Sequence, residues 1–259
     1  MPLNETPILE LRQIVKRFRL PRRRLNRPTQ VVHAVNKVNL SINLGETLAL
    51  VGESGCGKTT LGRCAIRLYQ PTEGSVLFRG IDVTETRGIG LHPFRKSVQM
   101  VFQDPNSSLN PRMQAASIIE EPMQIHQLGN RAFCRERVAE AMDAVGLSRQ
   151  FSNRYPHEFS GGERQRIAIA RTLVLEPDLI IADEPVSALD VSIQSQVLNL
   201  FAELREQRGL ALLFITHDLD ESLRLGDHIG ILNSGKLVQV GTPVDIIMNP
   251  ADDYVEEFV

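Results

Sequence analysis

Cysteine is scarce in this sequence, and its three residues suit neither a disulfide framework nor a zinc site. Cys56, Cys64 and Cys134 are an odd number and lack the spacing of metal ligands. A chain of 259 residues is long enough to bury a sizeable core. We therefore expect a globular protein of a reducing compartment.

Long apolar runs are also absent. The longest, residues 210–215, falls far short of the roughly 20 residues that cross a bilayer. Residues 1–10 lack the charged-then-apolar pattern of a secretory signal. We predict a cytoplasmic chain, peripheral on the inner face of the cell membrane, that reaches the membrane only through a partner.

The sequence has no strong excess of either charge. Its formal net charge is -2, whereas a nucleic-acid binder normally carries a large basic excess, so we expect no nucleic-acid partner. A basic run at residues 22–24, with Arg19 and Arg27 beside it, follows no helical face. We interpret it as a solvated loop rather than a contact with lipid head groups or an acidic partner.

Short β-rich apolar runs alternate with helical patterns, which predicts an α/β fold with a mostly parallel sheet. Between residues 104 and 159 the strand signals vanish, and helical segments lie between prolines and a glycine. We interpret that stretch as an inserted helical subdomain. The expected strands are residues 8–15, 47–51, 98–102, 179–182 and 211–216, and the expected helices are 58–68, 131–145, 162–175, 192–207 and the last ten residues.

A phosphate-binding loop follows the strand at residues 47–51. Gly52, Gly57, Lys58 and Thr59 occupy the fixed positions of G-x-x-x-x-G-K-[ST], between a strand and a helix. Such a loop turns backbone N–H groups toward phosphate oxygens, the lysine reaches the β- and γ-phosphates, and the threonine hydroxyl ligates Mg²⁺. The candidate ATP-binding residues here are Gly52, Glu53, Ser54, Gly55, Cys56, Gly57, Lys58, Thr59 and Thr60, with Mg²⁺ as the cofactor.

Cys56 lies inside this loop, among converging N–H groups and beside Lys58. Such surroundings are expected to lower the pKa of a thiol. We therefore predict that alkylation of Cys56 inactivates the protein and that Mg·ATP protects it.

Two carboxylates end the apolar run at residues 179–182. At the carboxyl edge of a parallel sheet, Asp183 and Glu184 would lie beside nucleotide phosphates. Asp183 would orient Mg²⁺, and Glu184 would act as the general base for the attacking water.

Ser160-Gly161-Gly162-Glu163-Arg164-Gln165-Arg166 resembles the signature of ABC-type ATPases, and three further elements lie where that family has them. Gln103 resembles the glutamine that bridges Mg²⁺ and the helical subdomain. Residues 187–190 resemble the loop that crosses to a partner cassette. His217 resembles the switch histidine that contacts the γ-phosphate. The resemblance covers essentially the whole chain.

The resemblance implies a single ABC ATPase domain. Its RecA-like P-loop core would comprise residues 1–103 and 165–259, with an antiparallel β portion at the N-terminus, and its helical subdomain residues 104–164. It also implies a head-to-tail pair, in which the signature of one cassette caps the γ-phosphate held by the other. The residues implied to bind ATP across the pair are Ser160, Gly161, Gly162, Glu163 and Asp190.

Two positions depart from the family pattern. The signature usually has glutamine where this chain has Glu163, and the added negative charge near the γ-phosphate is expected to weaken closure of the pair. Ser160 and Glu163 still have the spacing of a capping box. The adenine-stacking position is commonly tyrosine, and the best candidate here is Phe18, whose ring also offers a π-face.

The resemblance favours a transporter subunit over a soluble ABC ATPase. Repair members carry long insertions before the signature, and translation members carry two cassettes; this chain has neither. A free-standing cassette favours an importer, with permease subunits and an extracytoplasmic solute-binding protein as further partners. Residues 103–111 and 155–162 resemble the peptide/nickel importers, whereas residues 217–221, 240–243 and 249–255 resemble glycine-betaine and proline importer ATPases. Peptides or similar small solutes are the expected cargo, and osmoprotectants the alternative.

Overall fold

The computed structural model describes residues 6–20 and 30–259. They form two units: the described residues up to Arg87 together with Leu213–Val259, and Gly88–Leu212. The predicted basic loop at residues 22–27 lies outside the described residues. Among the described residues, no helix is both long enough and apolar enough to cross a bilayer.

The first unit contains an antiparallel sheet, as predicted for the N-terminal part of the chain. Its strand order is β2-β1-β4-β5. Buried and exposed residues alternate at the end of β2, which is typical of a sheet with one covered face. The strands are β1 (Leu9–Arg19), β2 (Val31–Ile42), β4 (Glu73–Phe78) and β5 (Ile81–Asp82).

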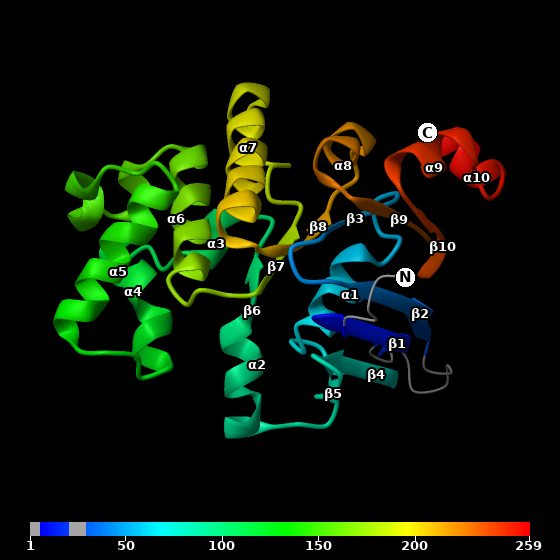
Figure 1. The fold of residues 1–259 in the computed structure, drawn as a ribbon, viewed down its shortest axis with the longest axis horizontal. Coiled ribbons are helices and arrows are strands. Elements are labelled where there is room, and N and C mark those ends of the chain that lie inside the picture. Colours follow the sequence, from blue (N-terminus) through cyan, green and yellow to red (C-terminus); the bar gives the residue numbers. More distant parts are fainter. Residues whose placement is uncertain (1–5, 21–29) are drawn as a thin grey trace. The chain divides into compact units, whose positions relative to one another are not determined.

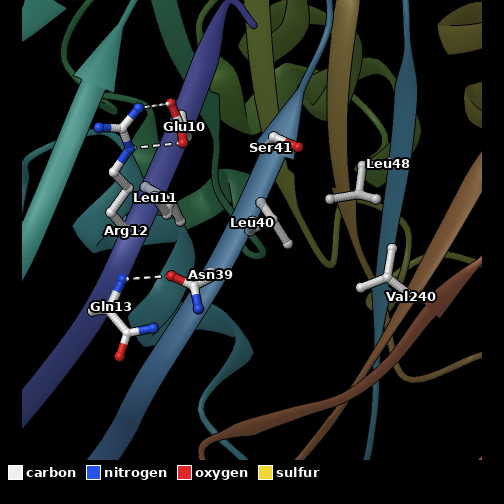
Figure 2. Close-up of a pocket in the computed structure, with 9 residues that line it drawn as sticks. All are labelled: Glu10, Leu11, Arg12, Gln13, Asn39, Leu40, Ser41, Leu48 and Val240. Atoms are coloured by element: carbon white, nitrogen blue, oxygen red, sulfur yellow. Dashed lines mark hydrogen bonds and ion pairs between the residues drawn. The ribbon is translucent and has the colours of Figure 1, made fainter. Parts of the chain in front are cut away.

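A groove of about 540 Å³ lies along this antiparallel sheet (Figure 2). Its polar edge carries the ion pair of Glu10 and Arg12, and Leu40, Leu48 and Val240 supply apolar surface. The remaining lining residues are Leu11, Gln13, Asn39 and Ser41. None of the predicted site residues lines this groove.

The first unit also contains β3 (Thr47–Val51), β9 (His228–Asn233) and β10 (Lys236–Gly241). β9 lies between β3, to which it is parallel, and β10, to which it is antiparallel. Every residue of β3 is buried, as in a strand covered on both faces. The helices of this unit are α1 (Lys58–Ala65), α8 (Leu219–Leu225), α9 (Pro243–Met248) and α10 (Asp253–Phe258).

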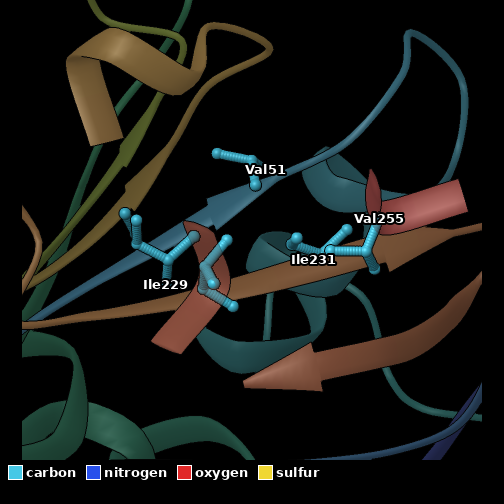
Figure 3. Packing of buried hydrophobic residues seen from close by; sticks show 6 residues of the cluster. Val51, Ile229, Ile231 and Val255 are labelled. Carbon is cyan, nitrogen blue, oxygen red and sulfur yellow. The ribbon is translucent and has the colours of Figure 1, made fainter. Parts of the chain in front are cut away.

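An apolar cluster fixes the C-terminal helices to the strand that leads into the phosphate loop. Ile246 of α9 and Val255 of α10 pack with Val51 of β3 and with Ile229 and Ile231 of β9 (Figure 3). All of these side chains are fully buried. Burying an aliphatic side chain contributes about 1.5–3 kcal/mol, so the C-terminal helices stabilise the first unit.

The second unit contains β6 (Val98–Val101) and β7 (Leu179–Asp183), which are parallel neighbours. β8 (Ala211–Ile215) crosses the division between the units, and its first residue donates a backbone hydrogen bond to Asp178 O at 2.9 Å. The helix α2 (His92–Ser97) precedes β6, and α7 (Val191–Arg208) follows β7 and ends at Gly209 in a left-handed conformation.

Helices fill the chain between β6 and α6. All residues from 104 to 159 are described and none is in a strand, which confirms the predicted loss of strand structure. The helix α4 packs against both α5 and α6 (Figure 1). The helices here are α3 (Pro105–Ser108), α4 (Ala115–Ile125), α5 (Arg131–Ala144) and α6 (Gly161–Leu173). The division into a core and a subdomain at residues 104–164 stays a prediction.

Candidate functional site

The phosphate loop occupies the turn between β3 and α1. Gly57 stands at the N-cap of α1 in a left-handed conformation, and its lack of a side chain leaves the first N–H groups of the helix without a side-chain cap. Uncapped N–H groups and the helix dipole make a helix N-terminus an anion site. The local geometry therefore suits a phosphate.

Two loop glycines are required by close backbone contacts. A Cβ on Gly52 would lie 2.1 Å from the carbonyl oxygen of Leu232, and one on Gly57 would lie 2.1 Å from that of Ala34. Gly235, in the turn between β9 and β10, donates its N–H to Cys56 O at 2.8 Å. The loop is thus held in shape by β2 and by the β9–β10 turn.

Lys58 is almost fully buried, with 4% of its surface exposed. Its ammonium donates to the carbonyl oxygens of Gly52 at 2.6 Å and Glu53 at 2.9 Å. A lysine held by the loop's own carbonyls is oriented before any phosphate arrives.

The prediction of a low pKa for Cys56 was wrong. Burial raises the pKa of this thiol above its ordinary value, and the charge of Lys58 opposes that shift only in part. The side chain is only 8% exposed, so desolvation of the thiolate outweighs the favourable charge.

We now expect slow alkylation of Cys56 by iodoacetamide at pH 7. Because a raised pKa leaves less thiolate at any given pH, the rate should increase as the pH rises toward and beyond 9.0, the ordinary value for a cysteine thiol. Cys64, whose pKa burial raises to about 11, should react still more slowly. Mass-spectrometric mapping measures both rates; labelling of Cys56 at pH 7 as fast as that of free cysteine would contradict the expectation.

Phe18 lies on β1, half-buried beside Tyr69. The two rings meet edge to face with centroids 5.6 Å apart, and Lys16 Nζ lies 5.1 Å from the Phe18 centroid. Its role in stacking adenine stays a prediction. The contact of Tyr69 with Phe18 was not predicted, because a lone tyrosine after a helix carries no sequence signal for a ring contact.

His217 follows β8 and is exposed. The preceding residue, Thr216, donates its N–H to Leu50 O of β3 at 3.1 Å. His217 is therefore anchored beside the strand that leads into the phosphate loop, in the same unit. Asp218, the next residue, caps α8 by accepting from Glu221 N at 3.2 Å.

In the second unit, strand register brings Gln103 and Glu184 together. Val101 of β6 is paired with Ala182 of β7, and Gln103 and Glu184 lie two residues beyond each. Gln103 Nε2 donates to Glu184 Oε2 at 2.7 Å. Asp183, between Ala182 and Glu184, is buried with 1% exposed.

Glu184 has a positive φ of 45°, which is strained for a residue with a side chain. Its carbonyl oxygen accepts from both the N–H of Ser187 at 3.3 Å and the hydroxyl of Ser187 at 3.1 Å. The loop at residues 187–190 is thereby tied to the candidate general base.

The signature segment begins α6 with a complete capping box, as predicted. Ser160 Oγ accepts from Glu163 N at 3.3 Å, and Glu163 Oε2 accepts from Ser160 N at 2.8 Å and from Ser160 Oγ at 2.8 Å. These bonds with Ser160 lower the pKa of Glu163, and the charges of Arg154 and Arg166 act in the same direction. Glu163 is therefore a carboxylate at neutral pH, and it is hydrogen-bonded to Ser160, the N-cap of its own helix.

Gly162 is required by the packing of α6 on α7. A Cβ there would lie 2.4 Å from Ile193 Cγ2, and one on Gly161 would lie 3.5 Å from Leu189 Cδ2. Asp190 stands at the N-cap of α7 but makes no side-chain cap bond, and it is exposed. The signature and the 187–190 loop are thus packed together, and the role of Asp190 across a pair stays a prediction.

Tyr254 of α10 is another residue that the sequence did not single out. Burial raises the pKa of its hydroxyl, which has no hydrogen-bond partner within the described part of the chain. Its ring packs on the apolar cluster of β3 and β9.

Comparisons with known proteins agree with this geometry. The family model described as "ABC transporter" matches residues 35–187. The oligopeptide transport ATP-binding protein AppF of Bacillus subtilis is 49% identical over 98% of this chain and 77% of its own length. The glutathione import ATP-binding protein GsiA of Pectobacterium atrosepticum is 42% identical over all of this chain, which spans 42% of that relative.

A solved structure agrees as well. The dimeric, post-hydrolysis form of the ATP-binding cassette MJ0796, bound to ADP and Pi, has a TM-score of 0.80 and 29% identity to this chain. The match covers 91% of this chain and 98% of the solved one.

Proposed function

Because this chain belongs to the ATP-binding subunits of the ABC transporter family, whose ATP hydrolysis is coupled to transport, we propose that it powers the import of oligopeptides. The observation that supports oligopeptides as the substrate is the 49% identity to AppF over 98% of the chain. That alignment includes most of the C-terminal segments that resemble osmoprotectant importers. The match to the glutathione protein is consistent with the same class, since glutathione is itself a small peptide.

The proposed assembly is a pair of cassettes on the cytoplasmic face of the membrane, docked on permease subunits. An extracytoplasmic binding protein would deliver the peptide. The dimeric form of the cassette MJ0796 supports the pair, and the lack of a side-chain cap bond at Asp190 leaves that residue available to a second copy.

We propose that ATP is bound in this chain by the phosphate loop, with Lys58 at the β- and γ-phosphates and Phe18 at the adenine. Lys58 would exchange the carbonyls of Gly52 and Glu53 for phosphate oxygens, and its buried position keeps water from competing. His217, anchored beside β3, would contact the γ-phosphate.

Each residue proposed to ligate Mg²⁺ has a side chain that suits this cation, Thr59 in the first unit and Asp183 and Gln103 in the second. Thr59 offers a hydroxyl, Asp183 a carboxylate and Gln103 an amide oxygen, and Mg²⁺ prefers oxygen ligands and keeps several waters. The contact of Gln103 with Glu184 uses the amide nitrogen, so the amide oxygen is the atom for a cation. When bound, Mg²⁺ would neutralise charge on the phosphates.

Glu184 would take the proton from the attacking water. The hydrogen bond from Gln103 Nε2 to Glu184 Oε2 fixes the direction of the carboxylate. In the proposed pair, the N–H groups of Gly161 and Gly162 of the other cassette would cap the γ-phosphate, beside Ser160. Glu163 is bonded to the hydroxyl and the N–H of Ser160, so its charge is directed at its own N-cap.

The proposed substrate is tested by measuring the uptake of labelled peptide in cells that lack this gene. Wild type should restore uptake of an oligopeptide, whereas the Glu184→Gln variant, made at the same level, should not. Labelled glutathione and glycine betaine are tested in parallel. Restored uptake of glycine betaine alone would replace the peptide assignment with the osmoprotectant alternative, and no restored uptake of any of the three would reject both.

A further inference from the structure

A cation and two aromatic rings of the first unit meet near the end of β1. Lys16 Nζ lies over both rings, 5.1 Å from the centroid of Phe18 and 5.6 Å from that of Tyr69. The rings themselves meet edge to face, with an interplanar angle of 77°. Aromatic pairs in this arrangement attract each other, and an ammonium is attracted by the face of a ring. Phe18 is therefore held by one aromatic and one cationic neighbour.

The sheet alone does not fix the ring of Phe18. Val31 and Val32, which pair with the last two residues of β1, are 43% and 46% exposed. A half-buried ring on such an open part of a sheet can change rotamer unless other side chains restrict it. Lys16 and Tyr69 supply this restriction.

Lys16 is itself held in place. Its ammonium donates to the carbonyl oxygen of Gln70 at 2.8 Å. Beside this bond, Thr72 Oγ1 accepts from the N–H of Arg17 at 3.0 Å, and the N–H of Thr72 donates to Val15 O at 2.7 Å. The chain that follows α1 is therefore hydrogen-bonded to β1, and the ammonium is fixed over the two rings.

Tyr69 is connected to the helix that follows the phosphate loop. Its hydroxyl accepts from Arg63 Nη1 at 3.1 Å, and the guanidinium carbon lies 5.6 Å from the ring centroid. Arg63 belongs to α1, which packs against β1 and β2 (Figure 1). The Nε of Arg63 is a buried atom with no hydrogen-bond partner among the described residues, so the loss of Tyr69 would leave this guanidinium with still fewer partners.

The strand β2 connects the same group of side chains to the phosphate loop a second time. Lys16 is paired with Val35, and the residue before Val35 is Ala34. A Cβ on Gly57 of the loop would lie 2.1 Å from the carbonyl oxygen of Ala34. A base on Phe18 and a triphosphate on the loop would thus bind to one connected part of the first unit.

We propose that Lys16 and Tyr69 are positioning residues that hold the ring of Phe18 in place before ATP binds, so that adenine stacks on a ring that is already ordered. The inference rests on the proposed function, because it assumes that Phe18 stacks on the base. Ordering one mobile side chain on binding weakens affinity about two- to tenfold, and Lys16 and Tyr69 remove this cost. Both act through Phe18.

The test compares ATP with tripolyphosphate, which has three linked phosphates and no base. Lys16→Met and Tyr69→Leu should each raise the Kd for Mg·ATP about threefold or more, because the ring must then be ordered on binding. The Kd for magnesium tripolyphosphate should stay unchanged, because the phosphate loop is intact. Calorimetric titration of the full chain measures both constants. An unchanged Kd for Mg·ATP, or an equal loss of affinity for both ligands, would overturn the proposal.

Phe18→Leu sets the limit of the effect and separates the two proposals. Loss of stacking should raise the Kd for Mg·ATP about tenfold or more and leave the Kd for tripolyphosphate unchanged. If this variant binds ATP as wild type does, adenine does not stack on Phe18, and the proposed adenine site fails together with the inference. If Phe18→Leu weakens ATP binding while Lys16→Met and Tyr69→Leu do not, the adenine site stands and only the inference fails.

Two further lysine variants test whether the cation matters at this place. Lys16→Arg keeps a cation over the rings and should bind ATP within about twofold of wild type. A Lys16→Arg protein as weak as Lys16→Met would contradict the positioning role. Lys236→Met, which removes an exposed lysine of the same unit, is the control and should leave both Kd values unchanged.

A fluorescent reporter measures the order of the ring directly. The sequence contains no tryptophan, so Phe18→Trp introduces a single indole at this position. Without nucleotide, its fluorescence anisotropy should fall when Lys16→Met is added, because the indole then moves more freely. Thermal unfolding of the same proteins shows whether they are folded. An anisotropy that Lys16→Met leaves unchanged in a folded protein would refute the positioning role.

Discussion

Replacing Glu184 with glutamine is expected to lower the rate of ATP hydrolysis about 10²–10⁴-fold, the usual contribution of a general base. Glutamine is nearly isosteric with glutamate and keeps an oxygen that accepts the hydrogen bond from Gln103 Nε2. The fold and the binding of ATP should therefore persist while the proton acceptor is lost. Phosphate release at saturating Mg·ATP measures the effect.

Glu163→Gln is the matched control for this change. It removes a carboxylate from the same unit, and glutamine also suits a capping box. Hydrolysis should remain within a few-fold of wild type in Glu163→Gln and nearly vanish in Glu184→Gln. Brisk hydrolysis by Glu184→Gln would remove Glu184 from the catalytic role.

Lys58→Ala should have the largest effect on nucleotide affinity. Loss of one partner of a buried, hydrogen-bonded charge pair costs roughly 2–5 kcal/mol, so the Kd for ATP should rise at least about 30-fold. Titration with a fluorescent ATP analogue measures the change. Thermal unfolding without nucleotide shows whether the variant is folded, since Lys58 also bridges the loop carbonyls.

Lys236→Ala provides the comparison, because Lys236 is an exposed residue at the start of β10. Its affinity for ATP should match that of wild type. A folded Lys58→Ala protein with unchanged affinity would mean that the nucleotide binds somewhere other than the phosphate loop.

Strands that are buried on both faces were well predicted from the sequence. The strand at residues 47–51 has the predicted bounds, and those at 98–101, 179–183 and 211–215 end within one residue of them. Their short, mostly apolar runs between turn residues are typical of buried strands. The segments β2, β4 and β10 were missed, because strands with exposed residues mix polar and apolar positions and give a weaker signal. β9 was missed as well, although its four central residues, which include Gly230, are buried.

The candidate site could likewise be predicted only in part from the sequence. Gln103 and Glu184 were named separately, and only the register of β6 against β7 brings them to hydrogen-bonding distance. Lys16 and Tyr69 carry no sequence signal for a contact between residues so far apart in the chain. The pKa of Cys56 could not be predicted from the residues next to it in the sequence. Lys58 is close and lowers this pKa, but burial, which depends on the packed fold, raises it by more.

The central claim is that ATP joins two copies of the cassette, and the size of Glu184→Gln in solution tests it most directly. With hydrolysis blocked, the signature of each copy should stay on the nucleotide of the other, so nothing separates the pair. Size-exclusion chromatography with light scattering should give a dimer with Mg·ATP and a monomer without it, and Lys58→Ala should stay monomeric in both conditions. A Glu184→Gln protein that binds ATP tightly yet remains a monomer would contradict the account.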